Sequence, residues 1–293
     1  MAHVLNTGKR LKAMLLGSGD RKPDLLDRAD EFRSVLNEFV EVVCEDFSYE
    51  SSLDDVEADM AIVLGGDGSI LRAAKQMGHR QVPVLGINLG RLGFLAALQP
   101  EDLRSALSCL ESGKYEIVDH LMMQVQVHRE GKVIAEGLGL NEAAILGGPP
   151  FDIQHIDLFV DGKLATTYSC DGLIISTPVG STAHNLSAGG PILRKNLQAF
   201  VISPISPHTL TVRPVVDTAD RIYEVVVSKP NDSTCIVLDG RVITQLSEMD
   251  RVRVCRAESV FQLIQIEGQN YYRTLREKLG WAGEFSYGEP EDS

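Results

Sequence analysis

The five residues Gly65-Gly66-Asp67-Gly68-Ser69 are the part of this chain best suited to chemistry. They follow an apolar run at 61–64 that predicts a buried strand, and they precede residues of helical composition at 70–75. Glycines let an anion approach the backbone amides, and a helix N-terminus favours negative charge. A carboxylate in such a turn can accept a proton or hold a metal ion. The alternative interpretation is a tight strand-to-helix turn capped by Asp67 and Ser69.

A second candidate site is the segment 171–191, in which an apolar strand runs into a block of glycines and hydroxyl groups. Its one charged residue is Asp171, at its start. Neutral donors and acceptors with close backbone approach are what a nucleoside pocket requires. A structural loop of this length would normally hold more Asp, Lys and Asn, so the composition favours binding. His184 within it could still be a solvated loop histidine.

Three shorter motifs carry weaker signals. Gly17-Ser18-Gly19 lacks the third glycine of a dinucleotide fingerprint, since position 22 is Lys22, and a simple turn is the better interpretation. The loop 86–94 has three glycines and Arg91 after a strand, so it is either a flexible loop or a wall of a ligand cleft. In Asn141-Glu142 the amide could contact a base and the carboxylate a ribose diol.

Two patterns along the chain predict the elements that position these residues. Up to about residue 115 strands alternate with helices, which predicts a parallel sheet with helices on both faces. From residue 121 the period becomes two, with hairpin dipeptides at Asp161-Gly162 and Asp239-Gly240, which predicts a sandwich-like β domain. Strands are expected at 12–16, 39–43, 61–64, 82–87, 221–227, 234–238, 251–255 and 261–266, and helices at 24–37, 70–75, 100–110 and 270–279.

The predicted fold is therefore a Rossmann-like α/β N-terminal domain followed by a β-rich sandwich-like C-terminal domain with a closing C-terminal helix. We expect an α/β domain that carries the glycine turn at 1–118 and a β-rich domain at 119–268. The closing helix and an acidic tail would occupy 269–293.

Composition excludes several classes of protein. The formal net charge of −13 argues against a nucleic-acid partner, and it means that an anionic ligand must be held by local amides, a metal ion and a few basic residues. No run of about 18 apolar residues suggests a membrane span, and the first twelve residues hold no secretory signal. Five scattered cysteines without C-x-x-C spacing indicate reduced thiols in a cytoplasmic protein.

Together, the Gly-Gly-Asp-Gly turn, the loop Gly90-Arg91-Leu92-Gly93-Phe94-Leu95, Asn141-Glu142 and the segment 171–191 resemble NAD kinases in order and spacing. The resemblance covers roughly residues 12 to 281, including Lys278-Leu279-Gly280-Trp281. Phosphofructokinases and the diacylglycerol and sphingosine kinases are similar only at the first turn, and the G-T-x-N-D loop of lipid kinases is absent.

The resemblance implies transfer of the terminal phosphate of ATP, or of another phosphoryl donor, to the 2′-hydroxyl of the adenosine ribose of NAD. It also implies that the domain at 1–118 carries the phosphate donor and the catalytic turn and that the domain at 119–268 binds NAD. Asp67 resembles the general base, and Asn141 with Glu142 resembles the pair that contacts adenine and ribose. The chain departs from the family at Val179, where Thr or Ser is common, at His184, where Tyr is usual, and at Arg241, where Gln is frequent. The implied NAD-binding residues are Asp67, Gly68, Arg72, Phe94, Asn141, Glu142, Asp171, Thr182, Ala183, His184, Asn185, Leu186, Ser187 and Arg241, and the implied phosphate-binding residues are Gly65, Gly66, Gly68 and Ser69.

The resemblance also implies Mg²⁺ or another divalent cation with ATP, without assigning protein ligands to it, and a homodimer or homotetramer in which two chains share a site. Magnesium suits a phosphate-rich site that has only oxygen ligands. Two alternatives remain from the residues alone: a non-catalytic NAD(P)-binding regulatory protein, and a lipid or sugar kinase of the same superfamily.

Overall fold

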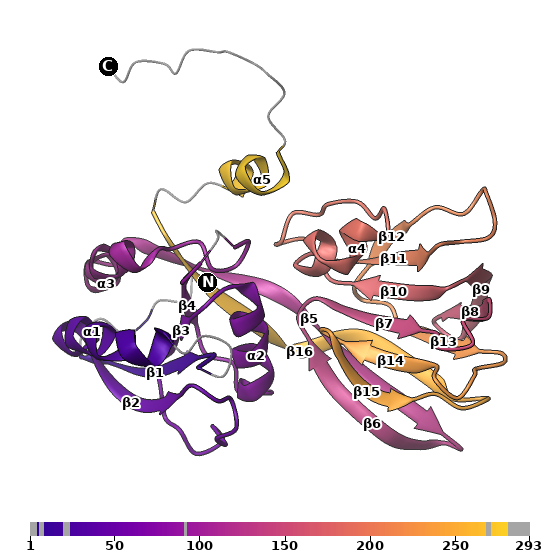
Figure 1. Cartoon of the computed structure of the whole chain (residues 1–293), viewed down its shortest axis with the longest axis horizontal. Coiled ribbons are helices and arrows are strands. Elements are labelled where there is room, and N and C mark those ends of the chain that lie inside the picture. Colours follow the sequence, from indigo (N-terminus) through magenta and orange to yellow (C-terminus); the bar gives the residue numbers. More distant parts are fainter. Residues whose placement is uncertain (1–4, 6–8, 20–23, 91–92, 268–270, 281–293) are drawn as a thin grey trace, which may run out of the picture. The chain divides into compact units, whose positions relative to one another are not determined.

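The computed structural model describes residues 5, 9–19, 24–90, 93–267 and 271–280 (Figure 1). The chain forms two compact units. Unit 1 comprises Met1–Ala73, Pro83–Ile117 and Leu263–Ser293, and unit 2 comprises Ala74–Val82 and Val118–Gln262. Among the described residues, none of the helices has the length and apolarity needed to span a membrane. That the first domain handles the donor and the second binds NAD stays a prediction.

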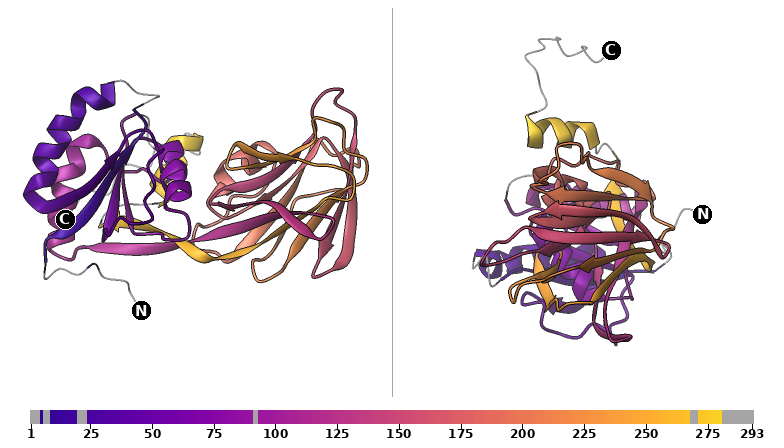
Figure 2. Two further views of the ribbon diagram at one scale, coloured as in Figure 1. Left: turned by 90° about the horizontal axis from the view of Figure 1, so that it is seen from below. Right: turned by 90° about the vertical axis from the view of Figure 1, so that its right-hand side faces the viewer.

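Unit 1 is built on a parallel sheet of order β2-β1-β3-β4, and the end of β16 pairs in parallel with β4. Every residue of β3 and β4 is buried, as expected for strands covered on both faces. Helices α1 and α3 cover one face and α2 the other (Figure 2). The predicted α/β alternation is confirmed. The bounds are β1 Leu11–Gly17, α1 Asp24–Phe39, β2 Val40–Asp46, β3 Met60–Leu64, α2 Asp67–Met77, β4 Val84–Ile87, a 3-10 turn at Pro100–Asp102 and α3 Leu103–Glu111.

Unit 2 is a sandwich of antiparallel strands, as predicted. One sheet has the order β12-β11-β10-β7-β14-β15, and the other contains β9, β8, β13, β16, β5 and β6. Inward residues of both sheets form a single apolar cluster that includes Phe200 and Tyr223. The bounds are β5 Tyr115–Arg129, β6 Lys132–Gly139, β7 Glu142–Leu146, β8 Gln154–Val160, β9 Lys163–Cys170, β10 Gly172–Ser176, a 3-10 turn at Gly180–Thr182, α4 His184–Ser187, β11 Ala199–Ile205, β12 Val215–Thr218, β13 Tyr223–Val227, β14 Cys235–Leu238, β15 Arg241–Gln245 and β16 Arg251–Ile266.

Strand β16 and helix α2 differ from the sequence-based expectation, and the closing helix agrees with it. The strands expected at 251–255 and 261–266 are one continuous strand, β16, in which the buried positions change from even (Val252, Val254) to odd (Ala257, Phe261) across the polar residues between them. Helix α2 begins at Asp67, three residues before the expected start, so the carboxylate lies in the first helical turn. The closing helix α5 spans Tyr271–Leu279, and the acidic tail lies outside the described residues.

Candidate functional site

The glycine turn of unit 1 is open on the side where an anion would approach. The Gly65 N–H donates to the Ile87 carbonyl at 2.8 Å, which joins the turn to β4. Gly65 has φ +144°, and a Cβ there would lie 2.1 Å from Ser69 Oγ, so the position requires glycine. A Cβ on Gly66 or Gly68 would meet nothing within 4 Å. The Cα atoms of Gly66 and Gly68 therefore border open space at the start of α2, where a helix N-terminus favours an anion.

The Asp67 carboxylate is fixed by three consecutive backbone amides from the loop after β4. Oδ2 accepts from the Phe94 N–H at 2.7 Å, and Oδ1 accepts from Leu95 and Ala96 at 2.8 and 3.1 Å. A carboxylate has about four acceptor positions, two on each oxygen. One position on Oδ2 therefore remains for a substrate hydroxyl.

The same loop is shaped by Asn88 and Gly93. Asn88 is buried, its Oδ1 accepts from the Gly90 N–H at 2.9 Å, and its backbone N–H donates to Leu98 at 2.7 Å. A Cβ on Gly93 would lie 2.2 Å from Asp67 Oδ1. The loop glycine is thus needed so that the amides can reach the carboxylate. Arg91 and Leu92, which belong to the motif read from the sequence, lie outside the described residues.

Arg72 of α2 contacts residues that follow β1 and β2. Its guanidinium donates to Ser18 Oγ at 3.4 Å and to the Ser48 carbonyl at 3.2 Å, and it lies 4.5 Å from the centroid of the Tyr49 ring. The Tyr49 hydroxyl donates to the Ser69 carbonyl at 3.0 Å. Arg72 and Tyr49 therefore join the loop after β2 to α2. Sequence reasoning missed Tyr49, and Arg72 as a ligand contact stays a prediction.

In unit 2, Asp239 repeats the arrangement seen at Asp67. Its carboxylate accepts from the N–H groups of Leu140, Asn141 and Glu142 at 2.8, 2.8 and 3.1 Å. Burial raises the pKa of Asp239, and the amide hydrogen bonds oppose that rise. The hairpin dipeptide Asp239-Gly240 signalled only a turn, so sequence reasoning missed that Asp239 positions Asn141 and Glu142.

Glu142 is the buried acid of this cluster. Its side chain is 4% exposed, Oε1 lies 3.0 Å from Nδ1 of the 64%-exposed His184, and Oε2 is buried with no hydrogen-bond partner among the described residues. Burial raises the Glu142 pKa to about 7, and His184 opposes the rise. Both residues line a hollow of about 240 Å³ whose other walls are mainly apolar, from Ala144, Ile174 and Val237 among others. Oε2 is therefore a buried acceptor whose hydrogen bond the described residues do not supply.

The segment 180–187 wraps around the same end of the sheet. A Cβ on Gly180 would lie 2.2 Å from the Asn141 carbonyl oxygen. Asn185 is fully buried, and its amide bonds to Ser203 Oγ and to the carbonyls of Ser181 and Pro191, so its side chain braces the segment. Thr182, Ala183 and Leu186 are half-buried, and Ser187 is exposed.

The sheet register brings Arg241 to this cluster and keeps Asp171 away from it. Leu238 pairs with both Ala143 and Arg241, which places Arg241 at the Glu142 end. Ser176 pairs with Glu142, whereas Asp171 precedes Gly172 at the opposite end of β10. Five residues of extended strand separate Asp171 from Ser176 by about 17 Å. Asp171 Oδ1 instead lies 3.6 Å from His208 Nε2.

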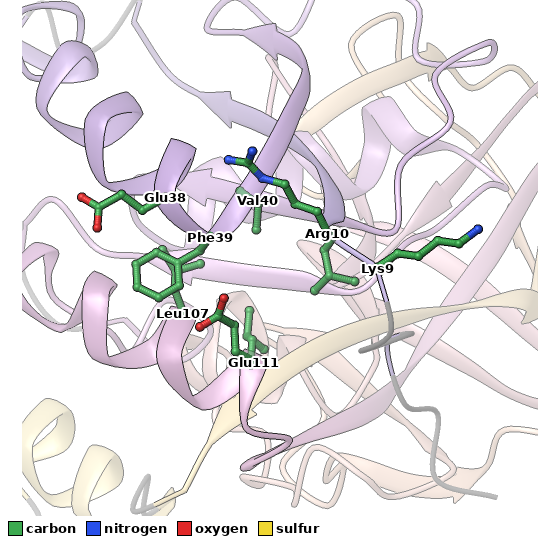
Figure 3. A pocket seen from close by; sticks show the side chains of 9 residues that line it. Lys9, Arg10, Glu38, Phe39, Val40, Leu107 and Glu111 are labelled. Atoms are coloured by element: carbon green, nitrogen blue, oxygen red, sulfur yellow. The ribbon is translucent and has the colours of Figure 1, made fainter.

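A larger hollow in unit 1 has a different character. It measures about 450 Å³ and is lined by residues at the end of α1, at the start of β1 and β2 and on α3, among them Phe39, Leu107 and Glu111 (Figure 3). Glu38 on its rim pairs with Arg104 at 2.6 Å. None of the predicted site residues lines it. The glycine turn at 65–68 lies at the other end of the strands, after β3.

Comparison with known proteins decides the family. The ATP-NAD kinase N-terminal domain model matches residues 23–115, and the ATP-NAD kinase C-terminal domain model matches residues 140–266. The chain belongs to the NAD kinase family. An NAD kinase of Rhodopirellula baltica is 56% identical over 276 residues, which cover 94% of this chain and 88% of the relative. An NAD kinase of Geotalea daltonii is 41% identical over 80% of this chain and 83% of the relative.

Solved structures agree with the NAD kinase fold. Yeast NADH kinase in complex with NADH matches with a TM-score of 0.84 and 22% identity, over 96% of this chain and 91% of that one. An NAD kinase from Archaeoglobus fulgidus in complex with ATP matches with a TM-score of 0.73 and 26% identity, over 93% of this chain and all of that one. Family membership rules out the alternative of a lipid or sugar kinase.

We expect Gly93→Ala to lower kcat by about 10²-fold, because the new methyl group would displace the Asp67 carboxylate. NAD binding, measured by calorimetry, should change little. Ala97→Gly is the matched control, since it alters the same loop by one methyl group and should keep near wild-type kcat. A Gly93→Ala enzyme with wild-type kcat would contradict the fixed position of Asp67.

The raised pKa of Glu142 predicts a pH-dependent KM for NAD. Above a pH of about 7 the Glu142 carboxyl group is ionised and Oε2 can accept a hydrogen bond. Below this pH the carboxyl group is protonated, so KM for NAD should rise as pH falls. The rise should approach tenfold per pH unit on the acid side. Glu142→Gln should raise KM for NAD and abolish this dependence. Parallel profiles for the two enzymes between about pH 6 and pH 8 would show that Glu142 is not the titrating group.

Proposed function

We propose that this NAD kinase transfers the terminal phosphate of ATP to the 2′-hydroxyl of the adenosine ribose of NAD, with Asp67 as the general base. The observation that supports this most directly is the Asp67 carboxylate, held by three amides in the first turn of α2 with one acceptor position free. A protein that only senses NAD(P) would have no use for a base in this place.

The reaction needs orientation and charge neutralisation more than covalent chemistry. The ribose 2′-oxygen forms a bond to the terminal phosphorus, the bond from that phosphorus to the bridging oxygen of ADP breaks, and the hydroxyl proton passes to Asp67 Oδ2. A positioned carboxylate contributes roughly 10²–10⁴-fold to such a proton transfer. The products are NADP and ADP.

Donor phosphates would bind at the glycine turn. Gly66 and Gly68 present open backbone at the N-terminus of α2, where amides and the helix dipole favour anions. Mg²⁺ binds through substrate phosphates and one or two carboxylates, and we propose that it accompanies ATP. It would neutralise charge on the phosphates. No group of three His, Cys, Asp or Glu side chains gathers as a metal site in the described part of the chain.

NAD would be held by the cluster in unit 2. Asn141 and Glu142 are aligned by Asp239, and the free Oε2 of Glu142 suits a ribose hydroxyl as its donor. Glu142 would make this contact in the ground state and in the transition state alike, so it should serve capture of NAD.

We further propose that the enzyme is a homodimer or homotetramer in which Asp171 of one chain completes the site of another. Within one chain Asp171 lies at the far end of β10 from Glu142, so the two residues cannot contact the same ribose or base, and a second chain would bring an Asp171 to that group. The six-stranded sheet ends in β12 and carries exposed Val215 and Val216 there, an apolar edge that a partner could cover.

Asp67→Asn should lower kcat by about 10²–10⁴-fold, because Asn keeps the shape but not the basicity. NAD binding should persist, and the melting temperature should fall slightly because the Asn NH₂ group must face one amide donor. Asp161→Asn is the control, since Asp161 also accepts a backbone N–H, from Ile222 at 3.0 Å, in the turn after β8. Activity of Asp67→Asn within about threefold of wild type would exclude the general-base role.

The shared site can be tested by complementation. Asp171→Ala and Glu142→Gln should each bind NAD poorly. When equal amounts of the two variants exchange subunits at random, about half of the dimers are mixed, and one of the two sites in each mixed dimer is intact. The mixture should therefore regain about a quarter of the wild-type activity. Light scattering should report at least a dimeric mass. A monomeric mass with full activity, or exchange of subunits without recovery, would refute the proposal.

A further inference from the structure

Helix α5 places Lys278 over the residue that holds the Asp67 carboxylate. The Lys278 Nζ lies 5.2 Å from the centroid of the Phe94 ring, and the Phe94 N–H donates to Asp67 Oδ2 at 2.7 Å. All three residues belong to unit 1. An ammonium group thus lies against the loop that fixes the proposed base.

The charge of Lys278 is available to a ligand. Its side chain is exposed, and the acidic neighbour Glu277 is already paired with Arg273 at 2.7 Å. Among the described residues, Lys278 has the Phe94 ring as its contact and no carboxylate partner. A cation on an aromatic face at an exposed site is held weakly, so a polyanion can draw it away.

The proposed reaction needs such a cation in unit 1. A chain of net charge −13 must bind a nucleoside triphosphate against its overall field, using local positive groups. Arg72, the basic residue of α2 nearest the turn in sequence, has its guanidinium engaged with Ser18, Ser48 and Tyr49. Lys278 approaches from a different element, with a long flexible stem and three N–H donors.

We infer that Lys278 leaves the Phe94 ring and binds the terminal phosphates of the ATP donor. The inference rests on the proposed function, because it assumes that ATP binds at the glycine turn. The Phe94 ring holds the ammonium close to that turn. When ATP binds, the ammonium neutralises part of its charge beside Asp67.

The direct test is binding of a non-hydrolysable ATP analogue with Mg²⁺, measured by calorimetry on the full-length protein. Lys278→Met removes the charge and keeps the stem, and it should weaken binding by about tenfold. Lys278→Arg should restore most of the affinity. Arg276→Met is the matched control, an exposed cation on the same helix, and it should stay within about twofold of wild type.

Steady-state kinetics separate the two phosphate-bearing substrates. For Lys278→Met, KM for ATP should rise while KM for NAD stays within about twofold. A rise in KM for NAD alone, equal losses in Lys278→Met and Arg276→Met, or unchanged analogue binding would each overturn the inference. Formation of NADP by the wild-type enzyme reports on the proposed function separately, since it does not depend on any of these variants.

Discussion

Both candidate sites depend on one kind of interaction, a carboxylate that accepts hydrogen bonds from three consecutive backbone amides. Asp67 accepts from residues 94–96, and Asp239 accepts from residues 140–142. Consecutive amides that point to one side cannot be satisfied by a neighbouring strand, and a carboxylate with several acceptor positions satisfies them together. Each hydrogen bond to a charged group contributes about 1.5–3 kcal/mol. These two acids therefore shape the loops that carry the remaining site residues.

The same constraint divides the glycines of the sites into two groups. Gly93 and Gly180 are each tightly packed against another group. A Cβ on Gly93 would lie 2.2 Å from Asp67 Oδ1, and a Cβ on Gly180 would lie 2.2 Å from the Asn141 carbonyl oxygen. Gly66 and Gly68 face open space. In the first group the missing side chain allows close packing against a carboxylate or a carbonyl oxygen, and in the second it leaves the space beside the turn open. A glycine-rich motif in this chain thus encodes both the positioning of groups and the approach of substrate.

Local patterns predicted the main elements because burial follows period and composition within a few residues. The buried strand β3, the turn after it and the alternation of unit 2 all have local causes. The contacts that complete the sites are not local. Asp67 bonds to amides 27 to 29 residues away, and Asp239 to amides 97 to 99 residues away. Nothing in the dipeptide Asp239-Gly240 distinguishes this acid from that of an ordinary hairpin. Likewise, the polar residues in the middle of β16 led to a prediction of two short strands where the structure has one long strand.

His184 shows how a change at one position alters the chemistry of the cluster. Where the resemblance to NAD kinases implies tyrosine, this chain has an imidazole 3.0 Å from a carboxylate that is almost fully buried. A tyrosine would offer a larger ring for stacking and no positive charge. The imidazole instead offsets part of the cost of burying Glu142 in its ionised form, and without it the Glu142 pKa would lie above its value of about 7. The exchange replaces stacking area with an electrostatic partner for the buried acid. It therefore leaves the free oxygen of Glu142 as an ionised acceptor over a wider range of pH.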